Sequence, residues 1–401
     1  HGKNLNPDLG SVRIIYSKPI DLHKHAVDNI VFNCPKCDEK MKRVPDVLDT
    51  WFDSGSMPYA QVHYPFENKE KFEANFPAQF IGEGVDQTRA WFYYLHAIAT
   101  AIKDSRAFNN VIVNGTVLAE DGKKMSKRLQ NYPDPMEVIE KYGADALRFY
   151  LLSSPVVRAE NLSFSEKGVD EAHKKVVLKI KNTLAFYKMY VDSSQSSVAS
   201  NQISENVLDK WILARLNVLT GEITKAMDKY ELNEAVRPIG DFVEDLSNWY
   251  VRRSRDRFKQ DGEDKNNATA TLHHVLIELS KLIAPFMPFV AEEVYKELGG
   301  EKAKSHSQNA IARSREAGFR ESVHLEEWPA FAKASAGQAK LIEDMNEVRK
   351  VASVGLELRL KEGIKVKQPL SSITAPEKLK PYASLIKDEL NVKEIIAGKE
   401  I

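Results

Sequence analysis

The stretch Val111-Ile-Val-Asn-Gly-Thr-Val-Leu-Ala-Glu-Asp-Gly-Lys-Lys-Met-Ser-Lys-Arg128 decides how the rest of the chain is interpreted. Its β-branched first half is typical of buried strands. Gly115 and Gly122 supply backbone freedom where the chain and a ligand approach closely. The second half carries four cations on six residues, namely Lys123, Lys124, Lys127 and Arg128. A mobile cationic loop at a strand end suits a polyphosphate whose charge shifts during a reaction. A solvated basic turn is the plainer alternative.

Two segments upstream carry further candidate site residues. Residues 80–95 predict a strand end, a glycine turn and an amphipathic helix, an arrangement that binds nucleotides in parallel α/β sheets. Glu83 and Asp86 in this turn could accept hydrogen bonds from ribose hydroxyls. A Gly-x-Gly turn alone is weak evidence, because structural turns use the same residues. Residues 46–56, which include Trp51, have the pattern that is usual for a core strand followed by a turn.

From Ser165 onward the sequence changes to long amphipathic segments, which predict a helical bundle. Apolar residues recur at helical spacing over 174–190, 208–223, 232–250, 272–283 and 290–298. The segment 136–152, after the cationic loop, also has helical periodicity, and Pro238 could kink the segment 232–250. Residues 191–204 and 299–318 are polar and without periodicity, which is typical of connectors. The last segment, 331–401, predicts a helix over 341–360 with short strand-like pieces.

An arginine cluster lies at the end of the second bundle segment. It comprises Arg252, Arg253, Arg255 and Arg257, with Trp249 beside it. Arginine and aromatic side chains together can bind phosphates and stack on unpaired bases. The alternative is that these cations stabilise a helix C-terminus while their stems cover apolar surface.

Cys34 and Cys37 form a single Cys-x-x-Cys pair near the start of the sequence. Zinc in structural sites takes four ligands, so this pair is half of a site that His23 and His25 could complete. A knuckle with two unbound thiols is the alternative. Two cysteines give no disulfide framework and favour a reducing compartment, so we expect a cytoplasmic protein.

The totals exclude some partners. Lys plus Arg and Asp plus Glu both number 57, so a global basic footprint for nucleic acid is absent and any RNA surface must be local. The sequence contains no apolar run of about eighteen residues, which a membrane-spanning helix would need.

Taken together and in order, these motifs resemble class I aminoacyl-tRNA synthetases, and within them the eukaryotic-like branch of isoleucyl-tRNA synthetases. The loop Lys124-Met-Ser-Lys-Arg128 is similar to the KMSKS loop of the class, with Arg in place of the last Ser. The other matching segments are 46–55, 82–92, 114–115, 142–148 and 248–257. The resemblance implies that isoleucine and ATP, with Mg²⁺, form isoleucyl-adenylate, and that the aminoacyl group passes to tRNA(Ile).

The resemblance also implies a role for each matching residue. Trp51 and Trp91 would wall the pocket for the isoleucine side chain, since flat apolar surface suits a branched alkyl group. The adenylate would be bound by Glu83, Gly84, Asp86 and Gln87, with Asn114 and Gly115 near the adenine. Lys124, Ser126 and Lys127 would act in catalysis, the lysines by stabilising charge on the triphosphate. Trp249, Arg252, Arg253, Arg255 and Arg257 would contact the tRNA anticodon arm.

The departures from the family pattern are equally specific. The class needs a His-x-Gly-His motif, and no such string occurs in these 401 residues. We therefore expect a chain that lacks the first half of the nucleotide fold and the editing domain. Such a chain would need the N-terminal half of the same enzyme as a partner for activity, and the resemblance implies a monomer when complete.

The predicted fold class is α/β plus all-α, in four segments. They are the tail of a connective insertion (1–44), the second half of a Rossmann-like catalytic domain (45–165), a helical anticodon-binding domain (166–330) and a C-terminal extension (331–401). Three alternatives remain open: a valyl- or leucyl-tRNA synthetase fragment, a non-catalytic tRNA-binding module, and a nucleotide-binding α/β protein of another family.

Overall fold

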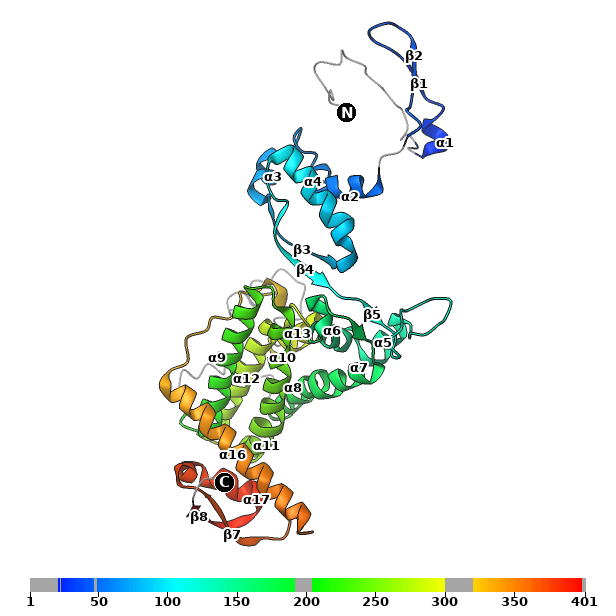
Figure 1. Cartoon of the computed structure of the whole chain (residues 1–401). Coiled ribbons are helices and arrows are strands. Elements are labelled where there is room, and N and C mark those ends of the chain that lie inside the picture. Colours follow the sequence, from blue (N-terminus) through cyan, green and yellow to red (C-terminus); the bar gives the residue numbers. More distant parts are fainter. Residues whose placement is uncertain (1–20, 22, 47–48, 192–203, 300–319, 399–401) are drawn as a thin grey trace. The chain divides into compact units, whose positions relative to one another are not determined.

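The computed structural model describes residues 21, 23–46, 49–191, 204–299 and 320–398 (Figure 1). The chain divides into two units. The first comprises residues 1–79 and 86–109, and the second residues 80–85 and 110–401. Each boundary between them falls inside the segment that the sequence assigns to the nucleotide fold.

The first unit is a small strand hairpin followed by packed helices. Its elements are α1 (Lys24–Val27), β1 (Val31–Asn33), β2 (Lys40–Lys42), α2 (Thr50–Ala60), α3 (Lys69–Asn75) and α4 (Trp91–Lys103). Tyr59, Phe72 and Ile98 form its small apolar core. Helix α2 approaches α4 closely at Gly55, where an added Cβ would lie 2.7 Å from the Cβ of Tyr94. A glycine is therefore needed at this helix contact.

The strands that surround the cationic loop pair two by two. β3 (Ala78–Gly84) pairs with β4 (Phe108–Asn114), and β5 (Val117–Leu118) runs parallel to β6 (Leu162–Ser163). The strands predicted from the β-branched runs are present, and among the described residues they form two-stranded pairs. Their predicted burial is wrong, because Val111 is 43% exposed and Ile112, Val113, Val117 and Leu118 are only half-buried. Such pairs are weak alone. The second pair gains support from its connections, since the Gly115 N–H donates to the Val156 carbonyl at 2.7 Å.

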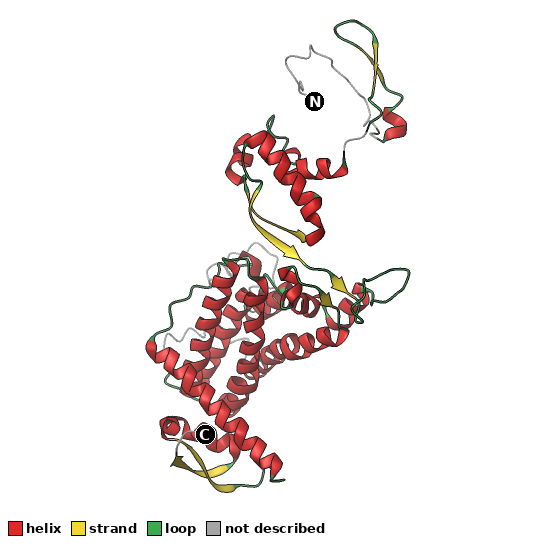
Figure 2. Cartoon of the chain, in the orientation of Figure 1, coloured by secondary structure: helices red, strands yellow, loops and turns green. Residues whose placement is uncertain are grey.

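A helical bundle makes up most of the second unit (Figure 2). Its elements are α5 (Pro135–Tyr142), α6 (Ala144–Leu152), η2 (Pro155–Arg158), α7 (Glu166–Ala172), η3 (His173–Val177), α8 (Leu178–Tyr190), α9 (Val207–Met227), α10 (Leu232–Glu244), η5 (Asp245–Val251), α11 (Arg252–Lys259), α12 (Glu263–Ile283) and α13 (Pro288–Leu298). The predicted apolar stripes form one core, in which Trp211, Phe242, Tyr250, Leu272 and Tyr295 are fully buried. The predicted bundle is confirmed.

Two local predictions in this region need correction. The segment 136–152, expected as one helical stretch, is two helices, because Gly143 between them has a φ of 84° and cannot continue an α-helix. The segment 232–250 is not interrupted at Pro238, which lies inside α10; its irregularity is the π-helical turn η5.

The C-terminal part is a long helix followed by a β-α-β unit. Its elements are η6 (Val323–Leu325), α16 (Ala336–Lys361), β7 (Leu370–Pro376), η7 (Glu377–Tyr382), α17 (Ala383–Leu390) and β8 (Val392–Gly398). The capping box of Ser335 and Gln338 starts α16, so the helix predicted over 341–360 is present and longer. β7 and β8 are parallel, and α17 packs against α16. At that contact an added Cβ on Gly355 would lie 2.6 Å from a methyl carbon of Leu390.

Parts of some predicted segments lie outside the described residues. They are most of the polar connectors 191–204 and 299–318, and Val47 and Leu48 in the segment around Trp51. Across the described helices, none combines the length and the apolar character that crossing a membrane requires.

Candidate functional site

The cationic loop of the second unit is braced by its own backbone and by one asparagine. The Ala119 N–H donates to the Lys123 carbonyl at 2.8 Å, and Gly122 takes a φ of 78° in the turn between them. Asn131 then bridges the loop: its Oδ1 accepts from the Ser126 N–H at 2.9 Å, and its Nδ2 donates to the Lys124 carbonyl at 3.2 Å. The residue that shapes the loop is therefore Asn131, which the sequence analysis did not single out.

The cations of this loop face solvent. Lys124, Lys127 and Arg128 are exposed, and within the described part of the chain no ion pair is formed by any of the three. Lys123 differs, since its Nζ lies 3.0 Å from the carboxylate of Asp121. The loop thus presents three charges that lack an ion-pair partner among the described residues, which is the electrostatic requirement for binding a polyphosphate.

The predicted adenine contact lies where β4 ends. An added Cβ on Gly115 would lie only 1.9 Å from the Glu160 carbonyl oxygen, so the glycine is needed for the backbone to pass this point. Asn114 is half-buried at the end of β4. Glu83 and Gly84 close β3, the strand that pairs with β4, and Glu83 is exposed. The structure therefore places these four predicted site residues at the ends of two neighbouring strands.

The other predicted pocket residues belong to the first unit, at the starts of two packed helices. Trp51 lies in the first turn of α2, with 41% of its surface exposed, and Trp91 begins α4. The indole N–H of Trp91 donates to the Ser54 carbonyl at 3.2 Å and so ties α4 to α2. The core strand considered for the segment around Trp51 is wrong, because the described part of that segment is helical.

Gln87 has a clear structural role in this unit. Its Oε1 accepts from the Trp91 N–H at 3.1 Å, which satisfies one of the unpaired donors at the start of α4. Its Nε2 donates to Asp86 at 3.2 Å, and the Asp86 carboxylate remains exposed. Gln87 thus orients the turn that carries Asp86.

The motif 142–148 follows the loop and fastens α6 to the bundle. Asp145 is 5% exposed, and its carboxylate accepts from the N–H groups of Phe289 and Val290, the latter at 2.6 Å. One helical turn later, Arg148 donates to the carbonyls of Pro285 and Phe286 at 2.9 and 2.8 Å. An anion thus meets the start of α13 and a cation meets the end of α12, as the two helix dipoles favour. Burial raises the pKa of Asp145, although these N–H bonds oppose the shift.

The predicted arginine cluster is already engaged in ion pairs within the chain. Arg252 lies 2.5 Å from a carboxylate oxygen of Glu389, and Arg253 lies 2.8 Å from Asp388 and 3.4 Å from Glu389. The guanidinium carbon of Arg252 lies over the indole ring of Trp249, 5.9 Å from the ring centroid. Arg255 is exposed and forms no ion pair with any described residue.

Arg257 points into the bundle. Its side chain is 11% exposed, and its guanidinium binds the carboxylate of Asp209 through two bonds of 2.8 and 2.7 Å. Three further bonds of 2.7 to 3.0 Å reach Asp264, and Tyr250 donates to Asp209 at 2.8 Å. This geometry favours a structural role for Arg257, joining α11 to α9 and α12.

Cys34 and Cys37 form the turn of the β1–β2 hairpin. The Cys34 N–H donates to the Glu39 carbonyl at 2.7 Å, and backbone N–H groups of Lys36 and Cys37 lower the pKa of the Cys34 thiol. Neither cysteine forms a disulfide. The described residues contain no group of three or more His, Cys, Asp or Glu side chains that could hold a metal ion. The donor set therefore does not fit a complete zinc site, and the zinc prediction gains no support.

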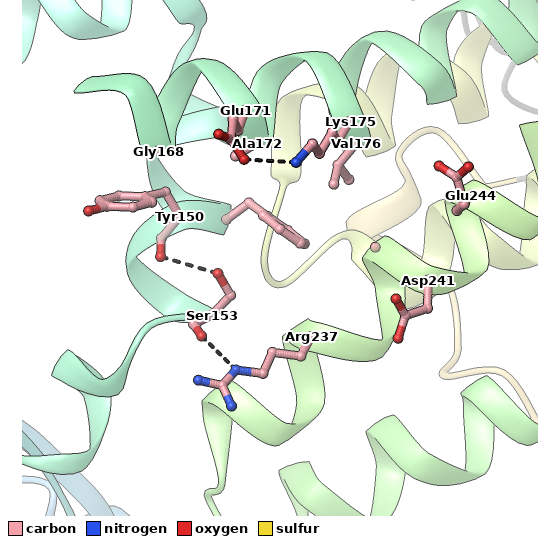
Figure 3. Close-up of a pocket in the computed structure, with 12 residues that line it drawn as sticks. Tyr150, Ser153, Gly168, Glu171, Ala172, Lys175, Val176, Arg237, Asp241 and Glu244 are labelled. Atoms are coloured by element: carbon pink, nitrogen blue, oxygen red, sulfur yellow. Dashed lines mark hydrogen bonds and ion pairs between the residues drawn. The ribbon is translucent and has the colours of Figure 1, made fainter. Parts of the chain in front are cut away.

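A pocket of about 430 Å³ opens between α6, α7 and α10 (Figure 3). Figure 3 shows Arg237 reaching the Ser153 carbonyl, and Lys175 paired with Glu171. None of the predicted catalytic or adenylate residues lines it. The pocket lies where α6, α7 and α10 meet, and no residue of the cationic loop lines it.

Comparison with known families assigns both halves of the chain. Residues 16–163 match the family of class I tRNA synthetases for I, L, M and V, and residues 209–374 match the anticodon-binding domain of tRNA ligases. The chain therefore belongs to the class I tRNA synthetases. The predicted fold class is confirmed as part of the catalytic domain followed by an anticodon-binding domain.

The chain is similar over most of its length to curated isoleucine--tRNA ligases. The chain is 46% identical over 391 residues to the isoleucine--tRNA ligase of Chlamydia trachomatis serovar D and 47% identical over 393 residues to that of Chlamydia muridarum. Each match covers 94% of this chain and 36% of the relative. The chain thus spans about a third of the length of these ligases.

Two solved structures share the fold. A leucyl-tRNA synthetase of Agrobacterium radiobacter K84, solved with tRNA and LeuAMS, matches 78% of this chain and 36% of its own length, with a TM-score of 0.55 and 22% identity. The methionyl-tRNA synthetase of Mycobacterium tuberculosis, solved with methionyl-adenylate, matches 69% of this chain and 57% of its own, with a TM-score of 0.53 and 20% identity. At these identities the likeness extends to the fold alone.

Proposed function

We propose that this chain is the part of an isoleucine--tRNA ligase that carries the signature loop and the anticodon-binding bundle. The complete enzyme would use ATP with Mg²⁺ to form isoleucyl-adenylate and transfer the aminoacyl group to tRNA(Ile). The isoleucine ligases among the relatives support this amino acid. The observation that carries the proposal is the braced loop, whose exposed Lys124 and Lys127 have no ion pair among the described residues.

The two lysines would stabilise the charge that develops as pyrophosphate leaves. Preorganised charges aimed at a transferring phosphoryl group are typically worth ~10²–10³-fold in rate per group. Ser126, braced through its backbone by Asn131, would hold the lysines on either side of it at a fixed spacing. Asn131 is accordingly a positioning residue for Lys124 and Lys127.

The test is isoleucine-dependent ATP–pyrophosphate exchange by the full-length enzyme. Lys127→Ala should reduce the rate by roughly 10²-fold or more. Lys123→Ala is the matched control, because Lys123 lies in the same loop but is paired with Asp121, and it should change the rate less than about threefold. Equal effects of the two variants would contradict the assigned role. The chain alone contains no His-x-Gly-His string, so we expect it to show no exchange by itself without the N-terminal half.

The remaining predicted site residues keep, in this proposal, the roles that the resemblance to the family gives them. Trp51 and Trp91 would wall the isoleucine pocket. Glu83, Gly84, Asp86 and Gln87 would bind the adenylate, and Asn114 and Gly115 would lie near its adenine. Exchange assays with isoleucine, valine and leucine on the full-length enzyme separate this reading from a valyl or leucyl enzyme. A higher kcat/KM for valine or leucine would refute the isoleucine assignment.

The first turn of α11 is proposed as the RNA-binding face. We define the arginine face as Arg252, Arg253 and Arg255, with Trp249 beside them. Arginine suits phosphate through its planar, bidentate donors, and Trp249 supplies a surface for stacking. Arg255→Ala should weaken tRNA binding and reduce its salt dependence, because each lost phosphate contact lowers the slope. Unchanged binding and an unchanged slope would contradict the proposal.

Other properties follow only by analogy with the family. The two free cysteines fit a cytoplasmic protein, and a monomer is expected for the complete enzyme. Zinc at Cys34 and Cys37 would need two further ligands. Metal analysis of the purified full-length enzyme, together with Cys34→Ser, would decide whether zinc is bound there.

A further inference from the structure

The arginine face is covered in part by the C-terminal β-α-β unit. Asp388 and Glu389 are consecutive residues in the last turn of α17, and both pair with arginines that lie more than 130 positions earlier in the sequence. The side chain of Glu389 is only 4% exposed and that of Arg253 14%, whereas Arg252 remains 47% exposed. Glu389 and Arg253 thus form the buried part of this group of ion pairs, and Arg252 forms its solvent-accessible edge.

The position of these two acids is unfavourable for the helix that carries them. The C-terminus of a helix bears partial negative charge, so carboxylates in its last turn are destabilising unless a cation is near. Here the compensating cations are Lys387 in the same turn and Arg252 and Arg253 on α11. The ion pairs with the arginine face therefore compensate these acids, while Leu385, Ile386 and Leu390 of the same helix belong to the apolar core that includes the bundle.

The carboxylates bind the arginines with the chemistry that an RNA phosphate would use. Both are oxyanions that accept charge-assisted hydrogen bonds from a guanidinium fork. The buried Nε of Arg253 has no hydrogen-bond partner among the described residues, so this side chain is not fully satisfied by the acids. A phosphate approaching the exposed Arg252 must displace Glu389 or be repelled by it.

We propose that Asp388 and Glu389 are an internal competitor for the RNA phosphate that the arginine face binds. This rests on the proposed function of that face as an RNA-binding surface. The acids lower the affinity of free enzyme for RNA, and RNA binding in turn breaks their ion pairs at the end of α17. By linkage, the two effects are one coupling free energy seen from either side.

The experiment compares tRNA affinities of full-length enzymes at low and moderate salt. The variant Asp388→Asn/Glu389→Gln removes both charges with little change in shape and should bind tRNA at least fivefold more tightly. The control Asp170→Asn/Glu171→Gln removes a matched adjacent pair on α7, whose partners are Lys174 and Lys175. The control should shift affinity less than twofold, which separates competition from a general change in net charge.

A second readout follows the loss of these ion pairs directly. Amide hydrogen exchange in residues 383–391 of the wild-type enzyme should become faster when tRNA is added, and the Asp388→Asn/Glu389→Gln variant should show fast exchange without tRNA. Unchanged affinity of the double variant, with unchanged exchange on tRNA addition, would overturn the inference.

A further pair of variants distinguishes failure of the inference from failure of the proposed RNA face. If Arg252→Ala and Arg255→Ala weaken tRNA binding while the acid variants have no effect, the face binds RNA and the competition does not exist. If neither arginine variant weakens binding, the RNA face itself is misassigned and the competition falls with it.

Discussion

Arg359 offers the sharpest stability test in the chain, because one buried cation satisfies four backbone carbonyls. The side chain lies in the last turn of α16 in a residue that is 3% exposed. Nη1 donates to the carbonyls of Lys365 and Gln368 at 3.1 and 2.9 Å, and Nη2 to those of Leu390 and Asn391 at 2.6 and 3.1 Å. The guanidinium thus joins the loop after α16 to the end of α17.

Replacing this residue by methionine keeps much of its length and removes all four bonds. Each hydrogen bond from a charged donor contributes about 1.5–3 kcal/mol, and a carbonyl left unpaired in a buried position costs about 1–3 kcal/mol. Some carbonyls regain water when the cation is gone, so the full sum will not be realised. We therefore expect Arg359→Met to destabilise the β-α-β unit by about 3–5 kcal/mol, close to what loss of a buried polar network typically costs.

Hydrogen exchange of residues 366–398 under native conditions is the appropriate assay, because the unit can open locally without unfolding the bundle. Arg359→Lys should recover less than half of the loss, since an ammonium cannot span the fork of carbonyls. Lys361→Met, two residues on and exposed, is the control and should stay within about 0.5 kcal/mol. Wild-type protection in Arg359→Met would refute the assignment of Arg359 as the fastening of this unit.

Three further predictions concern the stability of other contacts and of one buried histidine. In chemical unfolding, Arg148→Ala should destabilise the bundle by about 2–3 kcal/mol, because it loses two charged hydrogen bonds. Asp145→Ala should cost about 1–2 kcal/mol, because it loses a helix cap whose burial is itself costly. Losses below about 0.5 kcal/mol in both variants would contradict this role. Gly55→Ala should cost about 1–3 kcal/mol through the clash with Tyr94, whereas Gly337→Ala should cost little in the same assay, because its added Cβ would meet only the Ser335 Oγ at 3.9 Å. Burial lowers the pKa of His273 in the folded state, so the unfolded chain binds more protons and stability should rise with pH up to about 6.5; His273→Gln should lose less stability between pH 7.5 and pH 5.5 than wild type, and an equal loss would argue against it.

Sequence periodicity predicted the helical bundle well, because each helix of a bundle carries its own apolar stripe at helical spacing. The stripe at 208–223 places Trp211, Ile212 and Leu219 on one face of α9, and all three are buried. The same reasoning found α4 and α16. It could not predict the break at Gly143, since a single glycine is compatible with both a helix interior and a cap until its φ is known.

The candidate site was predictable where the signal is local. The cationic loop between β5 and α5 was identified from its composition, and its exposed lysines agree with that interpretation. Asn131 was missed, because an asparagine in a polar loop has many local uses and only its position relative to Ser126 and Lys124 shows that it braces them. A polar residue a few positions after a cationic loop is a signal that could be sought in other sequences.

The arginine cluster shows where local reasoning ends. A run of cations in a sequence establishes that the charges are near one another, but it does not show which of them already have an anion. Arg257 resembles its neighbours in the sequence, yet it binds Asp209 inside the bundle, 48 residues earlier in the chain. Arg252 and Arg253 pair with Glu389 and Asp388, and no sequence pattern links these acids to the arginines. If these arginines bind RNA as proposed, their availability depends on the competition between the two acids and the RNA phosphate, and measuring tRNA affinity with and without Asp388 and Glu389 is the direct way to determine it.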